Sequence, residues 1–321
     1  MRNTSMENLA LNCSRRSFLK RGALAALAMG WGSYPIESWA GDKKQQLTVL
    51  HTNDVHSRLD AFPNDGGAYA GQGGVIAREQ IIRKIRAERE QVLLLDAGDI
   101  FQGTPYFNFF KGEPEMKVMS LLGYDAATLG NHDFDNGIEG LVHQMQYADF
   151  PFVNCNYILE GTELEHQVKP YVIIRRGGLK IGIVGVGIEV KGLVPDHLCG
   201  GVLYTDPIEA VNTWADYLKN KKRCDYIICL SHLGFEYKTN QVSDKILAAE
   251  SENVQLILGG HTHTFLEEPH ITKNRKNQEV IVNQAGWGGL RLGEINIFFD
   301  NKKDYDYVSH SNVVIPRDSR V

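Results

Sequence analysis

The chain has 321 residues, of which 43% are hydrophobic and 23% are charged. This ordinary globular composition excludes a disordered or fibrous protein and allows one large domain or two small ones. The formal net charge is −5, and it falls to about −8 without the first forty residues, which argues against binding to a nucleic-acid polymer or an anionic membrane.

The N-terminal residues predict an export signal. Arg15 and Arg16 lie in the run SRRSFLK, a short apolar stretch follows at 22–32, and a small-residue cleavage site ends at Ala40. We therefore expect a signal peptide at 1–40, too short in its apolar part to span a bilayer. The residues around the arginine pair resemble a twin-arginine export signal, with a general secretory signal as the alternative. The protein is then periplasmic or extracellular.

Residues 41–321 are predicted to form one catalytic domain of the α/β class. Short apolar runs, which are typical of buried strands, lie at 47–52, 92–99, 126–131, 152–156, 181–187, 226–232, 256–261, 280–286 and 295–299. Helical patterns lie between many of them, at 75–90, 113–123, 138–148, 207–222 and 243–251. In the first helix, Ile76, Ile81, Ile82 and Ile85 are expected near one face. The alternation favours largely parallel strands.

The cysteines predict neither a zinc cluster nor a disulfide framework. Cys155, Cys199, Cys224 and Cys229 remain once Cys13 leaves with the signal peptide, and their spacing fits no known metal motif. We expect buried free thiols, although an oxidising compartment would permit a disulfide.

Five predicted strand ends share one chemical theme. They carry the segments HTNDVH (51–56), DAGD (96–99), GNHDFD (130–135), SHLG (231–234) and GGHTH (259–263). Ligands of open α/β sheets bind where the strands end. Bringing carboxylates and imidazoles together there costs free energy unless a cation compensates for their lost hydration. Nitrogen and oxygen ligands without thiolate suit Mn²⁺, Fe or Zn²⁺.

Two of these segments place candidate ligands two residues apart. Asp54 and His56, and likewise His261 and His263, would lie on the same side of an extended segment and face one ion. One such pair alone is more often a surface or hydrogen-bonded pair, and GNHDFD alone would be a turn. The five segments together predict a metal centre.

The ordered motifs D-x-H, G-D-x-x-x-G, G-N-H-D, a single His and G-H-T-H resemble the calcineurin-like metallophosphoesterase superfamily. LTVLHTNDVHSRL (47–59) and YDAATLGNHDFD (124–135) are similar to the two signatures of its 5′-nucleotidase family. The resemblance covers about residues 46–300. It implies a four-layer αββα sandwich with a two-metal site between the sheet ends.

The resemblance also implies roles for single residues. One metal would be held by Asp54, His56, Asp99 and His263, and the other by Asp99, Asn131, His232 and His261. Asp99 would bridge the two ions, while His132 would act beside the transferred phosphoryl group and Asp135 would hold His132. Asp133 stands where the family usually has Glu, so we expect a supporting or turn role. Gly130 is expected to let the chain turn sharply out of its strand.

The implied activity is hydrolysis of phosphomonoesters, most often 5′-nucleotides to nucleoside and phosphate, with two divalent ions. Mn or Zn is favoured over Fe, Co or Mg. The alternatives are a 2′,3′-cyclic nucleotide phosphodiesterase, a broad phosphoesterase or, outside enzymes, a metal-binding subunit acting with a separate substrate-binding chain. No C-terminal nucleotide-binding domain of the family is visible before Val321. We therefore expect either a separate chain of that type or activity on broader phosphate esters.

Overall fold

The computed structural model describes residues 45–316, without the side chains of residues 306 and 307. The expected signal peptide at 1–40 lies outside the described residues. All described residues belong to one compact unit. No helix within this part of the chain is long and apolar enough to cross a membrane.

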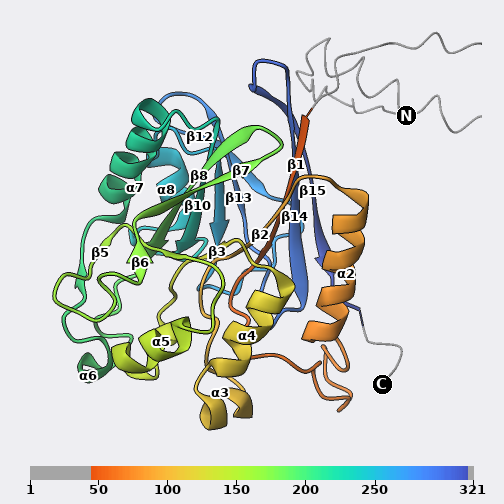
Figure 1. Ribbon diagram of the computed structural model, residues 1–321, viewed down its shortest axis with the longest axis vertical. Helices are drawn as coiled ribbons and strands as arrows, with labels where there is room; N and C mark the ends of the chain where they lie inside the picture. The colour runs from red at the N-terminus through yellow and green to blue at the C-terminus, as the bar shows by residue number, and fades with distance from the viewer. Residues whose placement is uncertain (1–44, 317–321) are drawn as a thin grey trace, which may run out of the picture. The chain divides into compact units, whose positions relative to one another are not determined.

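Two β-sheets form the middle of the fold (Figure 1). The seven-stranded sheet has the order β15-β14-β1-β2-β3-β4-β6, the six-stranded sheet has the order β12-β13-β11-β10-β8-β7, and β5 pairs with β9. The first sheet contains β1 (Gln45–Thr52), β2 (Val92–Asp96), β3 (Ala126–Ala127), β4 (Phe152–Val153), β6 (Val168–Lys169), β14 (Arg291–Phe299) and β15 (Tyr305–Val314). The second contains β7 (Tyr171–Arg176), β8 (Leu179–Gly187), β10 (Tyr226–His232), β11 (Leu256–Gly259), β12 (His270–Lys273) and β13 (Glu279–Asn283). The separate pair is β5 (Tyr157–Ile158) and β9 (Leu203–Tyr204).

The predicted parallel arrangement is confirmed for the centre of each sheet. Strands β1, β2, β3, β4 and β6 are parallel neighbours, as are β8, β10, β11 and β13. Antiparallel strands complete the sheets, with β14 and β15 on the first and β7 and β12 on the second. Because parallel strands end at the same edge of a sheet, the loops that follow them collect there.

Helices cover the outer face of each sheet, which gives the four layers expected from the sequence. α2 (Val75–Glu88), α4 (Glu113–Leu122) and α5 (Gly137–Met145) pack on the seven-stranded sheet, and α7 (Pro207–Asp216) and α8 (Asp244–Glu250) pack on the six-stranded one. Figure 1 shows α2 and α4 on the opposite side of the sheets from α7 and α8. The connections contain α3 (Pro105–Phe110), α6 (Asp196–Cys199), the 3-10 turn η2 (His132–Phe134) and the π-helical turn η3 (Tyr217–Lys221).

Alternating side chains of the buried strands fill three apolar layers. In β2, Leu93 and Leu95 pack between the two sheets, whereas Leu94 packs against the helices. In β10, Ile228 lies between the sheets and Ile227 lies on the side of α7 and α8. Full burial of one such side chain contributes about 1.5–3 kcal/mol. Strands that are apolar on both faces read as continuous apolar runs, which explains why the sequence predicted them.

The sequence did not predict the two-residue strands β5, β6 and β9, nor β7, β12 and β15. The last three lie at sheet edges; β12 and β15 carry polar side chains, and β7 has a short apolar run at 171–174 whose side chains are only half-buried. The expected apolar face of α2 was also partly wrong, because Ile76 is 59% exposed while Arg78 is buried with Ile82 and Ile85. Positions 78, 82 and 85 follow the helical period, and position 76 falls outside that face.

The four cysteines within the described residues are free thiols, as expected. Burial raises the pKa of the Cys155 thiol to about 12, and it raises that of Cys229 well above the ordinary value. Both thiols are therefore protonated and weakly reactive.

Candidate metal centre

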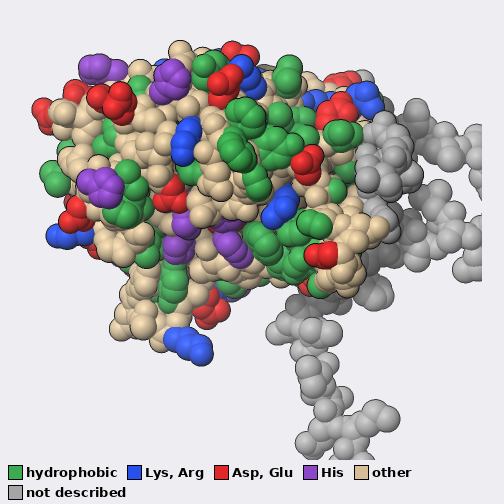
Figure 2. All heavy atoms as spheres, turned by 90° about the horizontal axis from the view of Figure 1, so that it is seen from below, with side chains coloured by type: hydrophobic (Ala, Val, Ile, Leu, Met, Phe, Trp, Pro, Cys, Tyr) green, Lys and Arg blue, Asp and Glu red, His purple; other side chains and the backbone are tan. Residues whose placement is uncertain are grey.

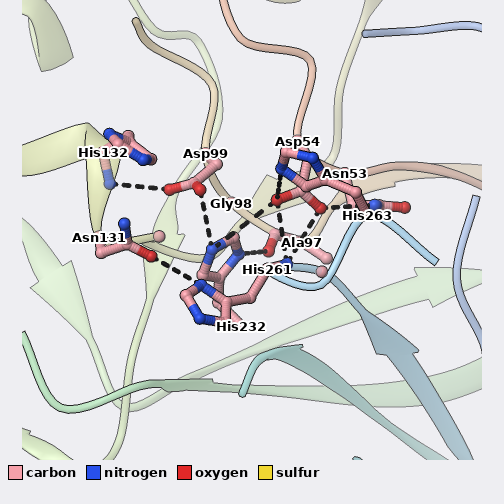
Figure 3. Close-up of polar contacts among 12 residues, drawn as sticks. Asn53, Asp54, Ala97, Gly98, Asp99, Asn131, His132, His232, His261 and His263 are labelled. Atoms are coloured by element: carbon pink, nitrogen blue, oxygen red, sulfur yellow. Dashed lines mark hydrogen bonds and ion pairs between the residues drawn. The ribbon is translucent and has the colours of Figure 1, made fainter. Parts of the chain in front are cut away.

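The loops after β1, β2, β3, β10 and β11 bring the predicted site residues together at one edge of the sheets (Figure 3). These residues are Asp54, His56, Asp99, Asn131, His132, Asp135, His232, His261 and His263. Figure 2 views the molecule from this end and shows histidine side chains near the middle of the face, with hydrophobic side chains beside them. Residues that are far apart in the sequence therefore share one site, which is open to solvent at His132 and His263.

Six of these residues form two groups of three potential metal ligands. The first triad contains Asp54, His56 and His263, and the second contains Asp99, His232 and His261. Within each triad the ligating atoms all lie within 4.8 Å of one another. The amide oxygen of Asn131 lies 2.8 Å from Nδ1 of His261, which places it at the second triad.

Asp99 lies between the two triads. Its Oδ2 is 3.1 Å from Nε2 of His232 and 3.8 Å from Nε2 of His56. Its Oδ1 accepts a hydrogen bond of 2.8 Å from the backbone N–H of His132. One carboxylate thus faces ligands of both triads while a backbone amide fixes its orientation.

The protonation of two imidazoles fits ligation of a cation. Nδ1 of His56 lies 3.1 Å from the carbonyl oxygen of Phe101, and Nδ1 of His232 lies 2.7 Å from that of Ala97. A carbonyl can only accept, so in each neutral ring Nδ1 carries the proton and Nε2 carries the lone pair. Nε2 of His56 is 3.0 Å from Nε2 of His263, and Nε2 of His232 is 3.1 Å from Oδ2 of Asp99. The facing lone pairs of His56 and His263 would be stabilised by a cation that both rings bind.

The charges of the site also favour a cation. Burial lowers the pKa of His232, but the carboxylates of Asp99 and Asp54 outweigh it and raise the pKa to about 10, so the ring holds a proton on Nε2 that a bound cation would replace. Burial and nearby His232 lower the pKa of His261 to about 4, which keeps that ring neutral. The carboxylates therefore create a site that favours positive charge. Its nitrogen and oxygen donors, without thiolate, fit divalent ions such as Mn²⁺ or Zn²⁺.

The triad residues converge through left-handed turns, so the predicted extended segments were wrong. The expectation that His261 and His263 face one ion was also wrong, because they belong to different triads. Positive φ angles occur at Asp54 (50°), His56 (52°), Asp99 (57°), His261 (73°) and His263 (53°). Such angles are uncommon in residues other than glycine, and each costs about 1–3 kcal/mol. The surrounding fold must hold these loops in place. Strain of this kind is concentrated at functional sites.

His132 and Asp135 form a hydrogen-bonded pair outside both triads. Nδ1 of His132 lies 2.8 Å from Oδ2 of Asp135, and the hydrogen bond raises the pKa of His132. The His132 ring lies edge-on to that of His56, with centroids 5.4 Å apart, and its side chain is 39% exposed. Because Nδ1 donates to Asp135, Nε2 is left to contact a ligand.

Asp133 braces the loop that carries Asp99. Its Oδ1 accepts hydrogen bonds from the backbone N–H groups of Ile100 (2.8 Å) and Phe101 (3.2 Å). Its Oδ2 accepts from those of Gly130 (2.8 Å) and Asp99 (3.1 Å). A supporting role was expected from the sequence, and these four bonds show what the buried carboxylate supports.

Replacing Asp133 by Ala should lower the free energy of unfolding by about 3 kcal/mol, because four buried amides lose their acceptor. Urea unfolding followed by circular dichroism measures this change. Asp149→Ala is the matched control, since Asp149 is exposed and its loss should cost less than about 0.5 kcal/mol. Equal stability of the two variants would contradict the bracing role.

Gly130 is required for close packing rather than for a sharp turn. Its φ is not positive, so the expected conformational reason was wrong. A Cβ at this position would lie 2.1 Å from Oδ1 of Asp99 and 2.4 Å from its backbone nitrogen. Any side chain at position 130 would displace Asp99.

Two supporting residues were missed by the sequence analysis. Asn53 donates from Nδ2 to Oδ2 of Asp54 and to the carbonyl oxygen of Gly286, each at 2.6 Å. Gln284 donates to the carbonyl oxygen of Gly260 at 2.6 Å and accepts from the N–H of Thr264 at 2.5 Å. Gln284 directly follows β13 and lies within the predicted run VIVNQAG (280–286). That position was the signal that could have identified it.

The protein-family model described as Calcineurin-like phosphoesterase matches residues 47–265 of this chain. This chain belongs to that family. The match contains both triads, Asn131 and the His132–Asp135 pair, so all of the predicted site residues lie inside it.

Relatives of this phosphoesterase include several 5′-nucleotidases. It is 36% identical to a snake venom 5′-nucleotidase of Gloydius brevicauda, over 87% of this chain and 47% of the relative. It is 33% identical to a 5′-nucleotidase of Vibrio cholerae, over 88% of this chain and 55% of the relative. The crystal structure of a 5′-nucleotidase precursor from Thermus thermophilus superposes with a TM-score of 0.74 at 31% identity, covering 84% of this chain and 54% of that one. The chain thus spans about half the length of the curated relatives it matches.

Proposed function

We propose that this phosphoesterase hydrolyses phosphomonoesters with two divalent cations and that 5′-nucleotides are its main substrates. The observation that carries the proposal is the pair of triads that meet at Asp99, with His132 and Asp135 beside them. The similar proteins named 5′-nucleotidase support the choice of substrate. The family and the two triads together indicate a dinuclear site.

The proposed ligand sets are those implied by the family resemblance. Asp54, His56, Asp99 and His263 would hold one ion, and Asp99, Asn131, His232 and His261 would hold the other. The donors favour Mn or Zn over Fe, Co or Mg. Two such ions would supply Lewis-acid polarisation of the phosphoryl group and lower the pKa of a nucleophilic water.

His132 has a separate role in the proposal. Asp135 fixes its ring through Nδ1, so Nε2 can donate its proton to an oxygen of the substrate. The backbone N–H of the same residue donates to Asp99. The position of the His132 ring is thereby tied to the carboxylate that lies between the triads.

A panel of esters on the purified full chain tests the function. With Mn²⁺ or Zn²⁺ added, we expect phosphate release to be fastest from 5′-nucleotides, slower from sugar phosphates, and absent after treatment with a chelator. Faster cleavage of 2′,3′-cyclic nucleotides would favour the phosphodiesterase alternative. No release from any ester by the metal-loaded protein would leave the binding-subunit alternative in place of an enzyme.

The export route stays a prediction of the sequence. We propose that residues 1–40 direct twin-arginine export to the periplasm or beyond, because SRRSFLK and the cleavage site at Ala40 are in the expected order. Arg15→Lys together with Arg16→Lys should leave the precursor in the cytoplasm, as fractionation and immunoblotting would show. Normal export of this variant would rule out the twin-arginine route.

A partner chain of the C-terminal nucleotidase type also stays a prediction. The ester panel bears on it, because full discrimination among nucleotides by this chain alone would make such a partner unnecessary.

A further inference from the structure

Four aromatic side chains, Phe62, Tyr69, Phe265 and Trp287, form an aromatic patch beside the metal centre. The ring of Trp287 stacks on the ring of His263, with centroids 5.7 Å apart and an interplanar angle of 13°. Phe62 and Tyr69 lie edge-on to Trp287, at 5.4 and 6.3 Å. Tyr69 stacks with Phe265 at 6.2 Å. A continuous series of ring contacts thus leads from a residue of the first triad to the surface.

The backbone holds this patch in place. In the loop between β1 and α2, the N–H of Phe62 donates to the carbonyl of Gln72 at 2.8 Å, and that of Gly71 donates to the carbonyl of Phe62 at 3.0 Å. Phe265 forms an isolated antiparallel bridge with Ala285. Rings held in this way lose little conformational entropy when they bind a ligand.

The patch is partly open to solvent and borders a cavity. Tyr69 is 37% exposed. A cavity of about 340 Å³ is lined by Tyr69, Gln72, Phe265, Leu290, Arg291 and Val314. Its size falls within the range of small-molecule sites, about 300–1,000 Å³. The rings provide apolar walls, while Gln72 and Arg291 add hydrogen-bonding groups.

Two guanidinium groups lie over the rings of the patch. That of Arg58 lies 4.4 Å from the centroid of Phe62, and that of Arg291 lies 5.0 Å from the centroid of Phe265. Arg291 is anchored by Glu267, with an N···O distance of 2.6 Å. Aromatic faces and guanidinium groups stack on nucleobases of any type, because every base has a flat π-face.

We propose that the aromatic patch binds the heteroaromatic base of a nucleotide whose phosphate lies at the metal centre. This inference rests on the proposed function and names the part of the same site that selects the leaving group. One sugar joins the phosphate of a 5′-nucleotide to its base, so the base must lie close to the metal centre. The patch satisfies this condition because Trp287 is in contact with His263. Tyr69 and Phe265 are then specificity-determining residues.

Titration of the metal-loaded full chain with adenosine, and with ribose for comparison, tests base binding without any hydrolysis. We expect adenosine to bind more tightly than ribose and Tyr69→Ala to weaken adenosine binding about tenfold. Tyr69→Phe should restore binding, since it keeps the ring. Tyr171→Ala is the matched control, because Tyr171 lies in another aromatic cluster, with Trp214 and Tyr217. It should leave adenosine binding unchanged.

Kinetics give a second readout. Tyr69→Ala should raise the KM for 5′-AMP about tenfold and leave the constants for glycerol phosphate unchanged, because glycerol has no ring to stack. Equal binding of adenosine and ribose, or equal effects on both esters, would overturn the proposal and leave the patch to another occupant. If the wild-type protein hydrolyses no ester, the proposed function fails, but the adenosine titration still decides whether the patch binds a base.

Discussion

Asp99→Asn should lower kcat/KM for phosphate release by about 10⁴-fold, equivalent to about 5 kcal/mol of lost transition-state stabilisation. Asp99 faces Nε2 of both His56 and His232, so its substitution disturbs both proposed ions at once. An amide has one oxygen and an NH₂ group in place of the second oxygen, and it therefore cannot bridge two cations. Initial rates with 5′-AMP and total metal by elemental analysis measure the two effects.

The bound metal should fall together with the activity. We expect the variant to hold fewer than two ions per chain, while Asp149→Asn, which changes an exposed carboxylate, should keep both ions and the full rate. Circular dichroism checks that each variant is folded. An Asp99→Asn protein with two ions and normal kcat/KM would show that this carboxylate is not a bridge.

The sequence predicted which residues lie close together, because parallel strands convert order along the chain into proximity in space. His51-Thr52-Asn53-Asp54 and GGHTH are about 200 residues apart, yet Asp54 accepts a hydrogen bond of 3.0 Å from the N–H of His261. Each segment directly follows an apolar run that could be recognised as a strand. The positions of the polar residues relative to those runs were sufficient to group them.

The detailed geometry could not be predicted in the same way. Asp and His adopt positive φ more often than most residues, but still rarely, so their presence alone does not predict the left-handed conformations of Asp54 and His56. An Asp at this position is typical of a turn. Only the fold brings the N–H groups of Ile100 and Phe101 to the carboxylate of Asp133. Tertiary contacts, rather than local preference, decide these features.

The aromatic patch had no sequence signal for the same reason. Phe62 and Trp287 are 225 positions apart, and neither belongs to a regular strand or helix. Single aromatic residues in loops are common on protein surfaces. The contacts of Phe62 with Trp287 and of Trp287 with His263 become visible only when the loops after β1, β11 and β13 are placed side by side.

His132→Asn should lower kcat for 5′-AMP by about 10³-fold, within the range expected for a lost proton donor, and should leave two ions bound. His132 is the predicted site imidazole that lies outside both triads, so its loss removes no proposed ligand. His143→Asn, which changes an exposed histidine, is the matched control and should keep the wild-type rate. Loss of metal from His132→Asn would reassign this residue to the metal site.

The leaving group identifies the substrate oxygen that His132 contacts. Proposed cations at the two triads already neutralise the phosphoryl oxygens, whereas the departing sugar oxygen of 5′-AMP needs a proton. Nitrophenolate departs without one. If Nε2 of His132 supplies that proton, the substitution should cost far less with 4-nitrophenyl phosphate than with 5′-AMP. An equal loss of kcat with both esters would instead place Nε2 of His132 on a phosphoryl oxygen. Asp135, hydrogen-bonded to Nδ1, would then orient an imidazole that stabilises negative charge and transfers no proton.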